Sequence, residues 1–502
     1  MPSRWVVVEP LWSWAELVAA TGGVAEGAAA SGVTGVSIDT RTLQAGDLFV
    51  ALRGDNQDGH VYVTKAFEKG ASAALVFTEF VTPAGSGPLV RVDDTLKAME
   101  RLGVAARARL GDDARVIAVT GSAGKTSTKE MLRLCLKSVD PHTHASEKSY
   151  NNHWGVPLTL ARMPRNTRYG VFEIGMNHAG EITPLTKMVR PHVAIITTVG
   201  PVHLGHFKSV EEIADAKAEI FAGLKPIPGS NDENVPRIAV LPADNEHFGR
   251  LNETALAAQQ KVLTFGHSSN ADFRMLSAGM GNMVDGMSVA MLHGDRNFIF
   301  YPGVSGEHHA LNATAALAAL STIGVDPSAV LEAFEEFTAV AGRGARHTFV
   351  VSPRSIVLID ESYNANPLSM AAALDTIWRT TLAERSVRHI AVLGDMRELG
   401  DESARLHLEL KGPVEEAHID KVFACGFYMQ ALFDALPEAI QGAYAEKSEG
   451  LIAPLLAAIQ PGDVIMIKGS LGTRMAPIVE AVKKHLTEWE KAGSKPQPPT
   501  SS

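Results

Sequence analysis

The residues best suited to chemistry in this sequence form a glycine-rich loop between a predicted strand and a predicted helix. The β-branched run 116–119 is typical of a buried strand, and residues 129–136 have the pattern of a helix. Such a loop turns backbone N–H groups toward a phosphate, while its lysine neutralises phosphate oxygens and its threonine reaches a magnesium ion. We therefore predict binding of a nucleotide triphosphate rather than an ordinary strand-to-helix turn. The predicted phosphate-binding residues are Thr120, Gly121, Ser122, Ala123, Gly124, Lys125, Thr126 and Ser127.

The loop differs from the usual P-loop in the position of its first glycine. A standard P-loop has four residues between that glycine and the Gly-Lys pair. Here that position is Val119, and the first glycine is Gly121. The loop therefore predicts a nucleotide but does not identify the reaction that uses it.

Two further side chains are candidates for metal binding. Glu173 lies near the end of the apolar strand 170–174, where a carboxylate is costly unless it is paired or bound to a metal. Its place at a strand end favours magnesium, a hard cation that prefers carboxylate oxygens. His203 follows a central strand, but a lone histidine is more often structural and His206 is a nearby competitor. The residues alone leave both interpretations of His203 open.

Lys217 lies on the apolar face of the predicted helix 210–221, because its neighbours three and four positions away are all apolar. Burial lowers the pKa of a lysine and yields a neutral, nucleophilic amine. Such an amine can react with carbon dioxide to form a carbamate, which would help to bind a second magnesium ion. The alternative is a lysine that lays its stem along the apolar surface and reaches solvent. Without further information this alternative is favoured.

Polar loops also follow two predicted strands in the last third of the chain. Residues 360–367 are rich in Asp and Asn, which are common turn and cap residues but also suit sugar hydroxyls or a peptide. Lys468 is followed by Gly and Ser, and this segment offers a cation and backbone N–H groups to a carboxylate. A plain strand-to-helix turn explains the second loop equally well.

Short apolar strands alternate with helices along the whole chain, and this predicts parallel sheets that are covered on both faces. Ligands gather at the carboxyl ends of such strands. We predict an α/β protein with three domains, at 1–93, 94–344 and 345–490, and a disordered tail at 491–502. The predicted strands are 35–38, 48–52, 73–77 and 90–93, then 116–119, 170–174, 193–199 and 238–241, then 356–360, 389–393, 421–424 and 464–468.

The composition is that of a globular protein and excludes several classes. The net charge of −10 argues against general attraction to nucleic acid or to anionic membranes. Cys135 and Cys425 both lie in apolar segments, so we expect buried thiols rather than a disulfide or a thiolate metal site. Neither a signal peptide nor an apolar run of spanning length is found, and we expect a cytoplasmic protein without membrane insertion.

In combination these motifs resemble the Mur ligases, the ATP-dependent peptide ligases of peptidoglycan precursor synthesis. Residues 120–126 are similar to the family's phosphate loop, and 150–159 to its Asn-Asn-x-x-Gly-x-Pro segment. Glu173 and His203 match its metal-binding residues, and Lys217 matches the lysine that carries a carbamate. The resemblance implies a small N-terminal UDP-binding domain, a central P-loop-type ATPase domain and a C-terminal Rossmann-like domain. It also favours metal binding by His203 and Lys217.

The resemblance further assigns nucleotide and substrate contacts. Asn312 would contact adenine, Arg343 would reach the nucleotide and Asp360 would lie at the ribose. Likeness at 37–41 with 48–52, at 363–367 and at 393–400 implies that D-Ala-D-Ala is joined to UDP-N-acetylmuramoyl-tripeptide (UDP-MurNAc-tripeptide). The implied contacts to these two substrates are Thr40, Arg41, Asn151, Asn152, Tyr363, Asn364, Asn366 and Lys468.

The implied reaction uses ATP to convert a carboxylate into an acyl phosphate, which an amine then attacks. Lys125, two magnesium ions and the carbamate would neutralise charge, with Thr126 and Glu173 at one ion and His203 and Lys217 at the other. We expect a monomer. Many members of the family place an arginine directly after the Lys-Gly-Ser motif, whereas the next arginine here is Arg474.

Three alternatives remain at this stage. A P-loop kinase or GTPase would explain the loop but not Lys217 or the third domain. A non-catalytic nucleotide-binding module would leave the metal residues without a role. The neighbouring Mur ligase, which adds a diamino acid, usually carries an Asp-Asn-Pro motif that this sequence lacks.

Overall fold

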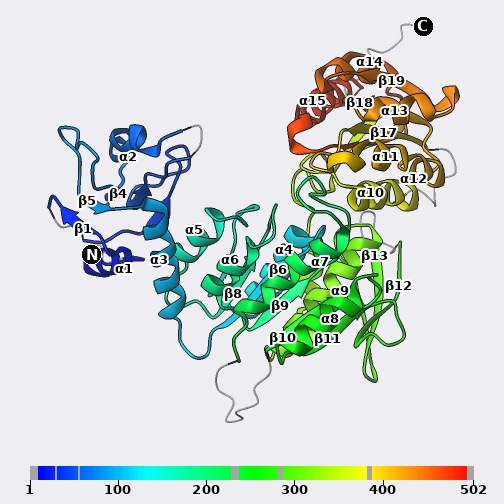
Figure 1. Ribbon diagram of the computed structural model, residues 1–502. Coiled ribbons are helices and arrows are strands. Elements are labelled where there is room, and N and C mark those ends of the chain that lie inside the picture. The colour runs from blue at the N-terminus through cyan, green and yellow to red at the C-terminus, as the bar shows by residue number, and fades with distance from the viewer. Residues whose placement is uncertain are drawn as a thin grey trace, which may run out of the picture.

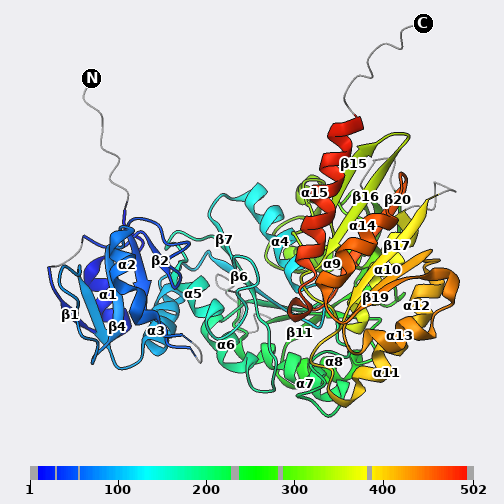
Figure 2. The ribbon, with the colours of Figure 1, turned by 90° about the horizontal axis from the view of Figure 1, so that it is seen from above.

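A computed structural model of the chain contains three sheets, each combined with helices (Figure 1). It describes residues 9–28, 31–54, 57–227, 237–280, 287–380 and 387–493. We refer to the parts built around the three sheets as the N-terminal, central and C-terminal units. In Figures 1 and 2 the N-terminal and C-terminal units lie at opposite ends of the central unit.

The N-terminal unit has a five-stranded sheet in the order β1-β5-β4-β3-β2, in which only the β1–β5 pair is antiparallel. Helix α2 (Val63–Glu68) covers one face, and helices α1 (Trp14–Thr21) and α3 (Thr95–Ala108) cover the other. The four strands predicted in this region are present. The strands are β1 (Val24–Glu26), β2 (Gly35–Ser37), β3 (Asp47–Val50), β4 (Ala73–Phe77) and β5 (Leu89–Val92).

The central unit has a nine-stranded sheet in the order β14-β13-β12-β11-β10-β9-β6-β8-β7. The pairs from β7 to β12 are parallel, as predicted, but β12, β13 and β14 add an antiparallel extension that the sequence analysis did not foresee. The strands are β6 (Arg115–Thr120), β7 (Thr143–Ala145), β8 (Tyr169–Glu173), β9 (Val193–Ile196), β10 (Ile238–Pro242), β11 (Lys261–Gly266), β12 (Phe273–Met280), β13 (Met287–His293) and β14 (Arg296–Phe300).

Helices cover both faces of the central sheet because its strands are apolar on both sides. In β6, Ile117 and Val119 pack toward α4 (Lys125–Val139) and α9 (Glu307–Thr322), while Val116 and Ala118 pack into the opposite layer. Helix α4 begins at Lys125 rather than at residue 129 as predicted, since Gly124 caps it in a left-handed conformation. The opposite layer contains α5 (Gly155–Ala161), α6 (Ile182–Val189), α7 (Val210–Ala218) and α8 (Phe248–Ala257).

The C-terminal unit has a six-stranded sheet in the order β15-β16-β20-β17-β18-β19, in which only the β15–β16 pair is antiparallel. Its strands alternate between two separate apolar cores, one on each face. The strands are β15 (Ala345–Val351), β16 (Arg354–Glu361), β17 (Arg388–Gly394), β18 (Lys421–Cys425), β19 (Gln441–Ala445) and β20 (Asp463–Lys468). The helices are α10 (Pro367–Thr380), α11 (Ser403–Leu408), α12 (Lys411–Glu416) and α13 (Met429–Ala435) on one face, and α14 (Ile452–Ala458) and α15 (Ala476–Gly493) on the other.

The predicted start of the disordered tail, at residue 491, is wrong. Helix α15 continues to Gly493, so residues 491–493 of the predicted disordered tail are helical. Residues 494–502 of that prediction lie outside the described residues. Short 3₁₀ helices connect other elements and are η1 (Gly59–Tyr62), η2 (Glu219–Gly223), η3 (Pro327–Val330), η4 (Glu332–Phe334), η5 (Gly400–Glu402), η6 (Glu438–Ile440), η7 (Ser448–Leu451) and η8 (Leu471–Thr473).

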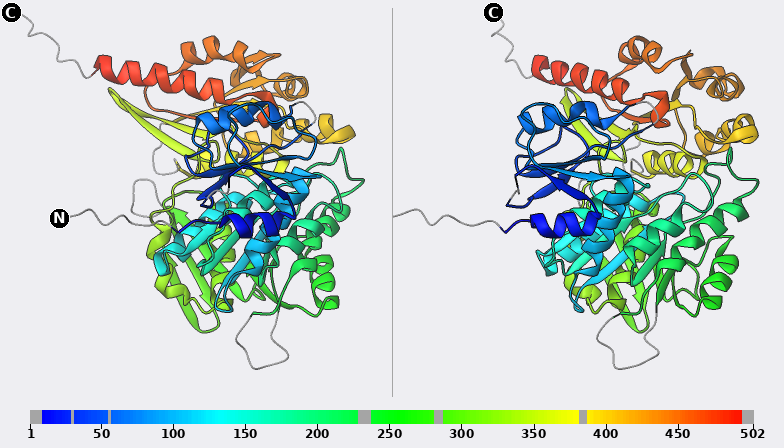
Figure 3. Two further views of the ribbon diagram at one scale, coloured as in Figure 1. Left: turned by 90° about the vertical axis from the view of Figure 1, so that its left-hand side faces the viewer. Right: turned by 60° about the vertical axis from the view of Figure 1, so that its left-hand side comes forward.

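The N-terminal and central units share one continuous apolar core, which runs from α3 into α5. Trp12 strengthens this junction: its indole Nε1 donates to the Ala161 carbonyl at 2.8 Å, and the Arg109 guanidinium lies 3.7 Å from its ring centre. The C-terminal unit instead keeps its own cores, and Leu204 packs against one of them as well as against the shared core. Figure 3 views the chain from the N-terminal end, with the C-terminal unit above the central one.

Both cysteines are buried and free, as expected. Of the helices in the described ranges, none combines the length and the apolar character that a membrane crossing requires.

Candidate functional site

The phosphate loop connects β6 to α4, and its two glycines are required by close contacts. Gly124 has a φ of +80°, and a Cβ there would lie 2.4 Å from Oδ1 of Asn312 on α9. Gly121 has a φ of +149°, and a Cβ there would lie 1.9 Å from the Thr197 hydroxyl. Both positions therefore exclude a side chain, and the loop follows a path that leaves the N-terminus of α4 open to a ligand.

Lys125 is the first residue of α4 and is folded back over the loop. Its Nζ donates to the carbonyl oxygen of Gly121 at 2.7 Å. Burial lowers the pKa of Lys125; the Glu173 carboxylate opposes this shift, and the Arg343 guanidinium adds to it. The amine therefore lies among charged groups in a water-poor site, where its charge would act strongly on a phosphate.

The Glu173 carboxylate is fully buried at the end of β8 and faces the phosphate loop. The hydroxyl of Thr126 donates to its Oε2 at 2.9 Å, and the side-chain amide of Asn151 donates to its Oε1 at 2.7 Å. A hydroxyl and a carboxylate beside a phosphate loop are the oxygen donors that Mg²⁺ prefers, so Thr126 and Glu173 fit such an ion. Within the described residues, no group of three or more His, Cys, Asp or Glu side chains forms a metal site by itself.

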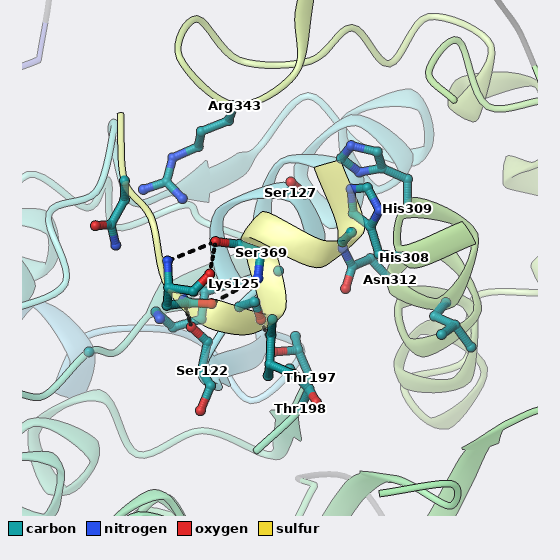
Figure 4. Close-up of a pocket in the computed structure, with 18 of the residues that line it drawn as sticks. Ser122, Lys125, Ser127, Thr197, Thr198, His308, His309, Asn312, Arg343 and Ser369 are labelled. Carbon is teal, nitrogen blue, oxygen red and sulfur yellow. Dashed lines mark hydrogen bonds between the residues drawn. The ribbon is translucent and has the colours of Figure 1, made fainter. Parts of the chain in front are cut away.

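A cavity of about 520 Å³ joins the phosphate loop to the C-terminal unit. Figure 4 shows how residues of the loop, of α9 and of the C-terminal unit surround it. The structure thus brings together most of the residues predicted to handle ATP, the metal and the dipeptide. Those that line the cavity are Ser122, Ala123, Gly124, Lys125, Ser127, Asn151, Glu173, His203, Asn312, Arg343, Tyr363, Asn364, Asn366 and Lys468.

The C-terminal unit contributes directly to this cavity. The side-chain amide of Asn366 donates to the carbonyl of Ser122 in the phosphate loop at 3.3 Å. Arg343 donates to the Ser149 hydroxyl at 3.0 Å, and its guanidinium carbon lies 4.3 Å from the ring centre of Tyr363. The nucleotide part of the cavity is therefore closed partly by residues that follow the central unit in sequence.

Lys468 lies at the end of β20 and is only 2% exposed. Its Nζ lies 2.9 Å from Oε2 of Glu361 and donates to the carbonyl of Asn364 at 3.1 Å. Glu361 thus balances the charge of Lys468 and holds its amine against the loop that contains Asn364.

His203 lies on the loop after β9 and adopts a left-handed conformation with a φ of +55°. Its Nδ1 lies 2.5 Å from Oε2 of Glu398, a residue of the C-terminal unit. The hydrogen bond from His203 holds the pKa of Glu398 below its ordinary value, although burial opposes this shift. His203 therefore lines the cavity while it is bound to the neighbouring unit.

Lys217 is 2% exposed on α7, and its apolar neighbours are buried as their pattern predicted. Burial lowers the pKa of Lys217 well below its ordinary value, and the nearby charge of Lys125 lowers it further. This shift favours a neutral amine. Lys217 does not line the cavity itself.

Three other predicted residues do not line the cavity. Asp360 accepts hydrogen bonds from the backbone N–H of Gly342 at 3.0 Å and from the Ser362 hydroxyl at 2.6 Å. The side-chain oxygen of Asn152 accepts from the backbone N–H of Gly155, the first residue of α5, at 2.9 Å. Thr120 is fully buried in β6.

A second cavity, of about 690 Å³, lies between the N-terminal and central units. Thr40 and Arg41 line it, together with Tyr150 and Trp154 from the central unit. The Arg41 guanidinium pairs with both carboxylate oxygens of Asp39, at 3.0 and 2.6 Å. Tyr150 and its neighbour Asn151 thus border different cavities, so this segment forms part of the wall between the two.

The sequence analysis missed several residues that line the first cavity. His308 and His309 belong to the first turn of α9, one turn before Asn312, and within the described part of the chain the Nδ1 of His309 has no hydrogen-bond partner. Asp244 and Asn245 follow the carboxyl end of β10, so the strand-end rule could have found them. Glu398 lies in the segment 393–400, from which only the identity of the substrate was predicted.

Comparison with known proteins assigns the three parts of the chain to related families. Residues 32–109 match the family described as Mur ligase family, catalytic domain, and residues 119–320 match Mur ligase middle domain. Residues 342–471 match Mur ligase, glutamate ligase domain.

Similar proteins cover nearly the same length. The UDP-N-acetylmuramoyl-tripeptide–D-alanyl-D-alanine ligase of Rickettsia prowazekii is 32% identical, over 89% of this chain and 94% of that protein. The ligase of the same name from Bacillus subtilis is 33% identical, over 89% and 93%. A crystal structure of MurF from Acinetobacter baumannii superposes with a TM-score of 0.79 at 28% identity, over 95% of this chain and all of that one.

Proposed function

The chain belongs to the Mur ligase family, and on this basis we propose that it joins D-Ala-D-Ala to UDP-MurNAc-tripeptide at the expense of ATP. The products are UDP-MurNAc-pentapeptide, ADP and phosphate. This reaction belongs to peptidoglycan precursor synthesis. A diamino-acid-adding ligase or a kinase is disfavoured, because the full-length relatives with about one-third identity carry the name of the D-Ala-D-Ala-adding enzyme.

The observation that carries this function is the shared cavity. It places Lys125 and Glu173 of the central unit opposite Tyr363, Asn364 and Asn366 of the C-terminal unit. A ligase must hold a nucleotide and an incoming amine on either side of one carboxylate, and a cavity bordered by two units provides two such sides. A kinase would need no second α/β unit for this purpose.

In the first step, the terminal carboxylate of the tripeptide attacks the γ-phosphate of ATP and releases ADP. Both reactants are anionic, so neutralisation of charge is the main requirement. Lys125 is placed to supply it once its amine leaves the Gly121 carbonyl for the phosphate. The resulting acyl phosphate has a good leaving group. The amine of D-Ala-D-Ala then attacks the acyl carbon, and phosphate departs.

The metal assignments extend this proposal. Thr126 and Glu173 would hold one Mg²⁺, since their oxygens lie together beside the phosphate loop. His203 and a carbamate on Lys217 would hold a second. When bound, the ions would withdraw negative charge from the phosphates and from the attacking carboxylate. The burial of Lys217 supports a neutral amine, which is the form that reacts with carbon dioxide.

We assign the UDP group to the second cavity, because Thr40 and Arg41 line it. The segment that contains Tyr150 and Asn151 separates this cavity from the nucleotide cavity. A long precursor could therefore keep its UDP end in one cavity while its peptide end reaches the other. The active unit in this proposal is a monomer.

Phosphate release tests the function directly. We expect ATP-dependent release with UDP-MurNAc-tripeptide plus D-Ala-D-Ala, and none with the dipeptide precursor plus diaminopimelate or lysine. Release with only the second pair would identify the diamino-acid-adding ligase. Release that depends on neither pair would favour a kinase or another nucleotide hydrolase.

Lys217→Ala tests the carbamate. This variant should lose activity that bicarbonate cannot restore, because no amine is left to react. Short-chain carboxylates such as acetate should restore part of it by supplying the missing oxygens. The matched control is Lys137→Ala, since Lys137 lies on the exposed face of α4. Full activity of Lys217→Ala without additives would rule out this role.

A further inference from the structure

One loop of the central unit and one loop of the C-terminal unit are in contact beside the nucleotide cavity. Residues 203–206 follow β9, and residues 398–400 follow β17. The Nδ1 of His203 lies 2.5 Å from Oε2 of Glu398, and the backbone N–H of Gly205 donates to the Glu398 carbonyl at 3.0 Å. Glu398 is thus bound through both its side chain and its backbone.

Both loops have unusual backbone conformations at the residues that make this contact. His203 and Glu398 are not glycines, yet they adopt left-handed φ values of +55° and +64°, which cost free energy for such residues. A Cβ on Gly400 would lie 2.9 Å from the Cα of Gly205, so the backbones are in close contact. Leu204 packs against the cores of both units. The loops are therefore shaped to bring Glu398 to His203.

The two ring nitrogens of His203 have different surroundings. Nδ1 is bound to Glu398, whereas among the described residues no hydrogen bond is made by Nε2. His203 also lines the cavity that contains the phosphate loop. Histidines that bind metals generally use one nitrogen for the metal and donate the N–H of the other to a carboxylate or carbonyl, which fixes the tautomer and the ring orientation.

We propose that Glu398 is the positioning residue of His203, which it holds with Nε2 presented to a divalent cation in the nucleotide cavity. Glu398 belongs to the C-terminal unit, so metal binding by the central unit depends on the position of its neighbour. This inference rests on the proposed metal role of His203. It goes beyond that role because it gives the docking of the C-terminal unit a direct effect on the metal.

Other charged groups near Glu398 do not replace this contact. His178 and His206 also lie close to it, but their rings stack on each other with centres 4.3 Å apart, and His178 pairs with Glu181 at 2.7 Å. The described hydrogen bonds of the Glu398 carboxylate include neither of these rings. The effect of Glu398 should therefore be transmitted through His203.

The test measures Mn²⁺ affinity by electron paramagnetic resonance in the presence of a non-hydrolysable ATP analogue. The variants are Glu398→Ala, Glu398→Gln, His203→Ala and the double variant with both alanines. Glu398→Ala should weaken Mn²⁺ binding about 10- to 100-fold, the usual effect of removing a partner of a metal-bound histidine. Glu398→Gln should retain part of the affinity, because its amide oxygen still accepts from Nδ1. In the His203→Ala background, loss of Glu398 should have no further effect.

The matched control is Glu402→Ala, which removes a nearby carboxylate that pairs only with Arg405 among the described residues. It should leave Mn²⁺ affinity unchanged, and all variants should bind the analogue equally in the absence of metal. If His203→Ala weakens binding and Glu398→Ala does not, the inference about Glu398 is wrong but the metal role of His203 stands. If Glu398→Ala is equally harmful without His203, Glu398 does not act through the histidine. If His203→Ala has no effect, both proposals are overturned.

Discussion

Lys217 is a buried lysine for which the described residues provide no carboxylate partner. Its burial lowers its pKa well below the ordinary value of 10.5, and Lys125 adds to this effect. A buried amine that must lose its proton on folding weakens the folded protein at neutral pH. A chemical use for the neutral amine, as in the carbamate proposal, would offset this cost.

This argument predicts a pH-dependent stability difference for Lys217→Met. Between the lowered folded pKa and 10.5, the unfolded chain keeps the lysine proton that the folded chain has lost. The wild type therefore gains stability as the pH rises through this window, and the methionine variant lacks this gain. The advantage of Lys217→Met should be largest at the low end of the window, fall by about 1.4 kcal/mol per pH unit, and vanish near the unfolded pKa.

Urea unfolding in carbon-dioxide-free buffer, followed from pH 7 upward in about one-unit steps, checks this slope. The control is Lys137→Met, which changes an exposed lysine on α4 and removes no buried amine. The same pH slope in both variants would contradict the prediction.

At the residue scale, the sequence predicts best those groups whose surroundings are set by residues close to them in the chain. Glu173 could be predicted as buried because its strand is apolar. The apolar helix neighbours of Lys217 placed it on an apolar face, but the residues alone favoured a side chain that reaches solvent, whereas the structure buries it. Glu398 could not be predicted, because it meets His203 across 195 positions of sequence and its own segment looks like a polar turn. His309 was missed since a helix start with two histidines has no periodic signal.

At the scale of elements, the start of α4 depends on the absence of a side chain at Gly124. Gly124→Ala would add the strain of a left-handed φ, about 1–2 kcal/mol, and would also push a methyl group into Asn312. We expect ADP to bind about tenfold more weakly or worse, because the loop and Asn312 both contribute to the cavity. Isothermal titration calorimetry would measure this change.

Gly180→Ala is the matched control for this substitution. Gly180 has a φ of +86°, close to that of Gly124, but a Cβ there would meet nothing within 4 Å. It should lose similar stability and keep its ADP affinity. Equal loss of affinity in both variants would show that the effect is not specific to the phosphate loop and its contact with Asn312.

The burial pattern of β13 and β14 explains why sequence reasoning missed these two strands. The predicted strands were continuous apolar runs, and such runs occur where helices cover both faces of a sheet. Strands β13 and β14 alternate between buried and more exposed residues, because helix α9 packs on only one side of this antiparallel extension. Their alternating pattern was therefore overlooked. The strands that were predicted in the parallel parts of the sheets are mostly buried, whereas β7, β11 and β19, which pair in parallel but are more exposed, were missed as well.

At the scale of the whole molecule, the three units differ in whether they share an apolar core with a neighbour. One apolar core extends through the N-terminal and central units, whereas the C-terminal unit has two cores of its own. The C-terminal unit meets the central one through polar contacts around the cavity, such as Asn366 to Ser122 and His203 to Glu398, and through Leu204, which packs against cores of both units. Contacts of this kind suit an interface that opens and closes to admit substrates and exclude water.

This division predicts two thermal transitions in calorimetry of the protein without ligand: one for the N-terminal and central units together, and one for the C-terminal unit. Trp12→Ala should destabilise only the first by about 3–5 kcal/mol, because Trp12 fills the shared core and bonds to Ala161. Trp378 is partly buried and packs against a core of the C-terminal unit, so Trp378→Ala is the control and should lower only the second transition. A non-hydrolysable ATP analogue at about 100 times its Kd should stabilise the unit that binds it by about 2.7 kcal/mol. Because both units line the nucleotide cavity, the analogue should raise both transitions and bring them closer together. A ligand effect confined to the first transition would mean that the C-terminal unit does not take part in nucleotide binding.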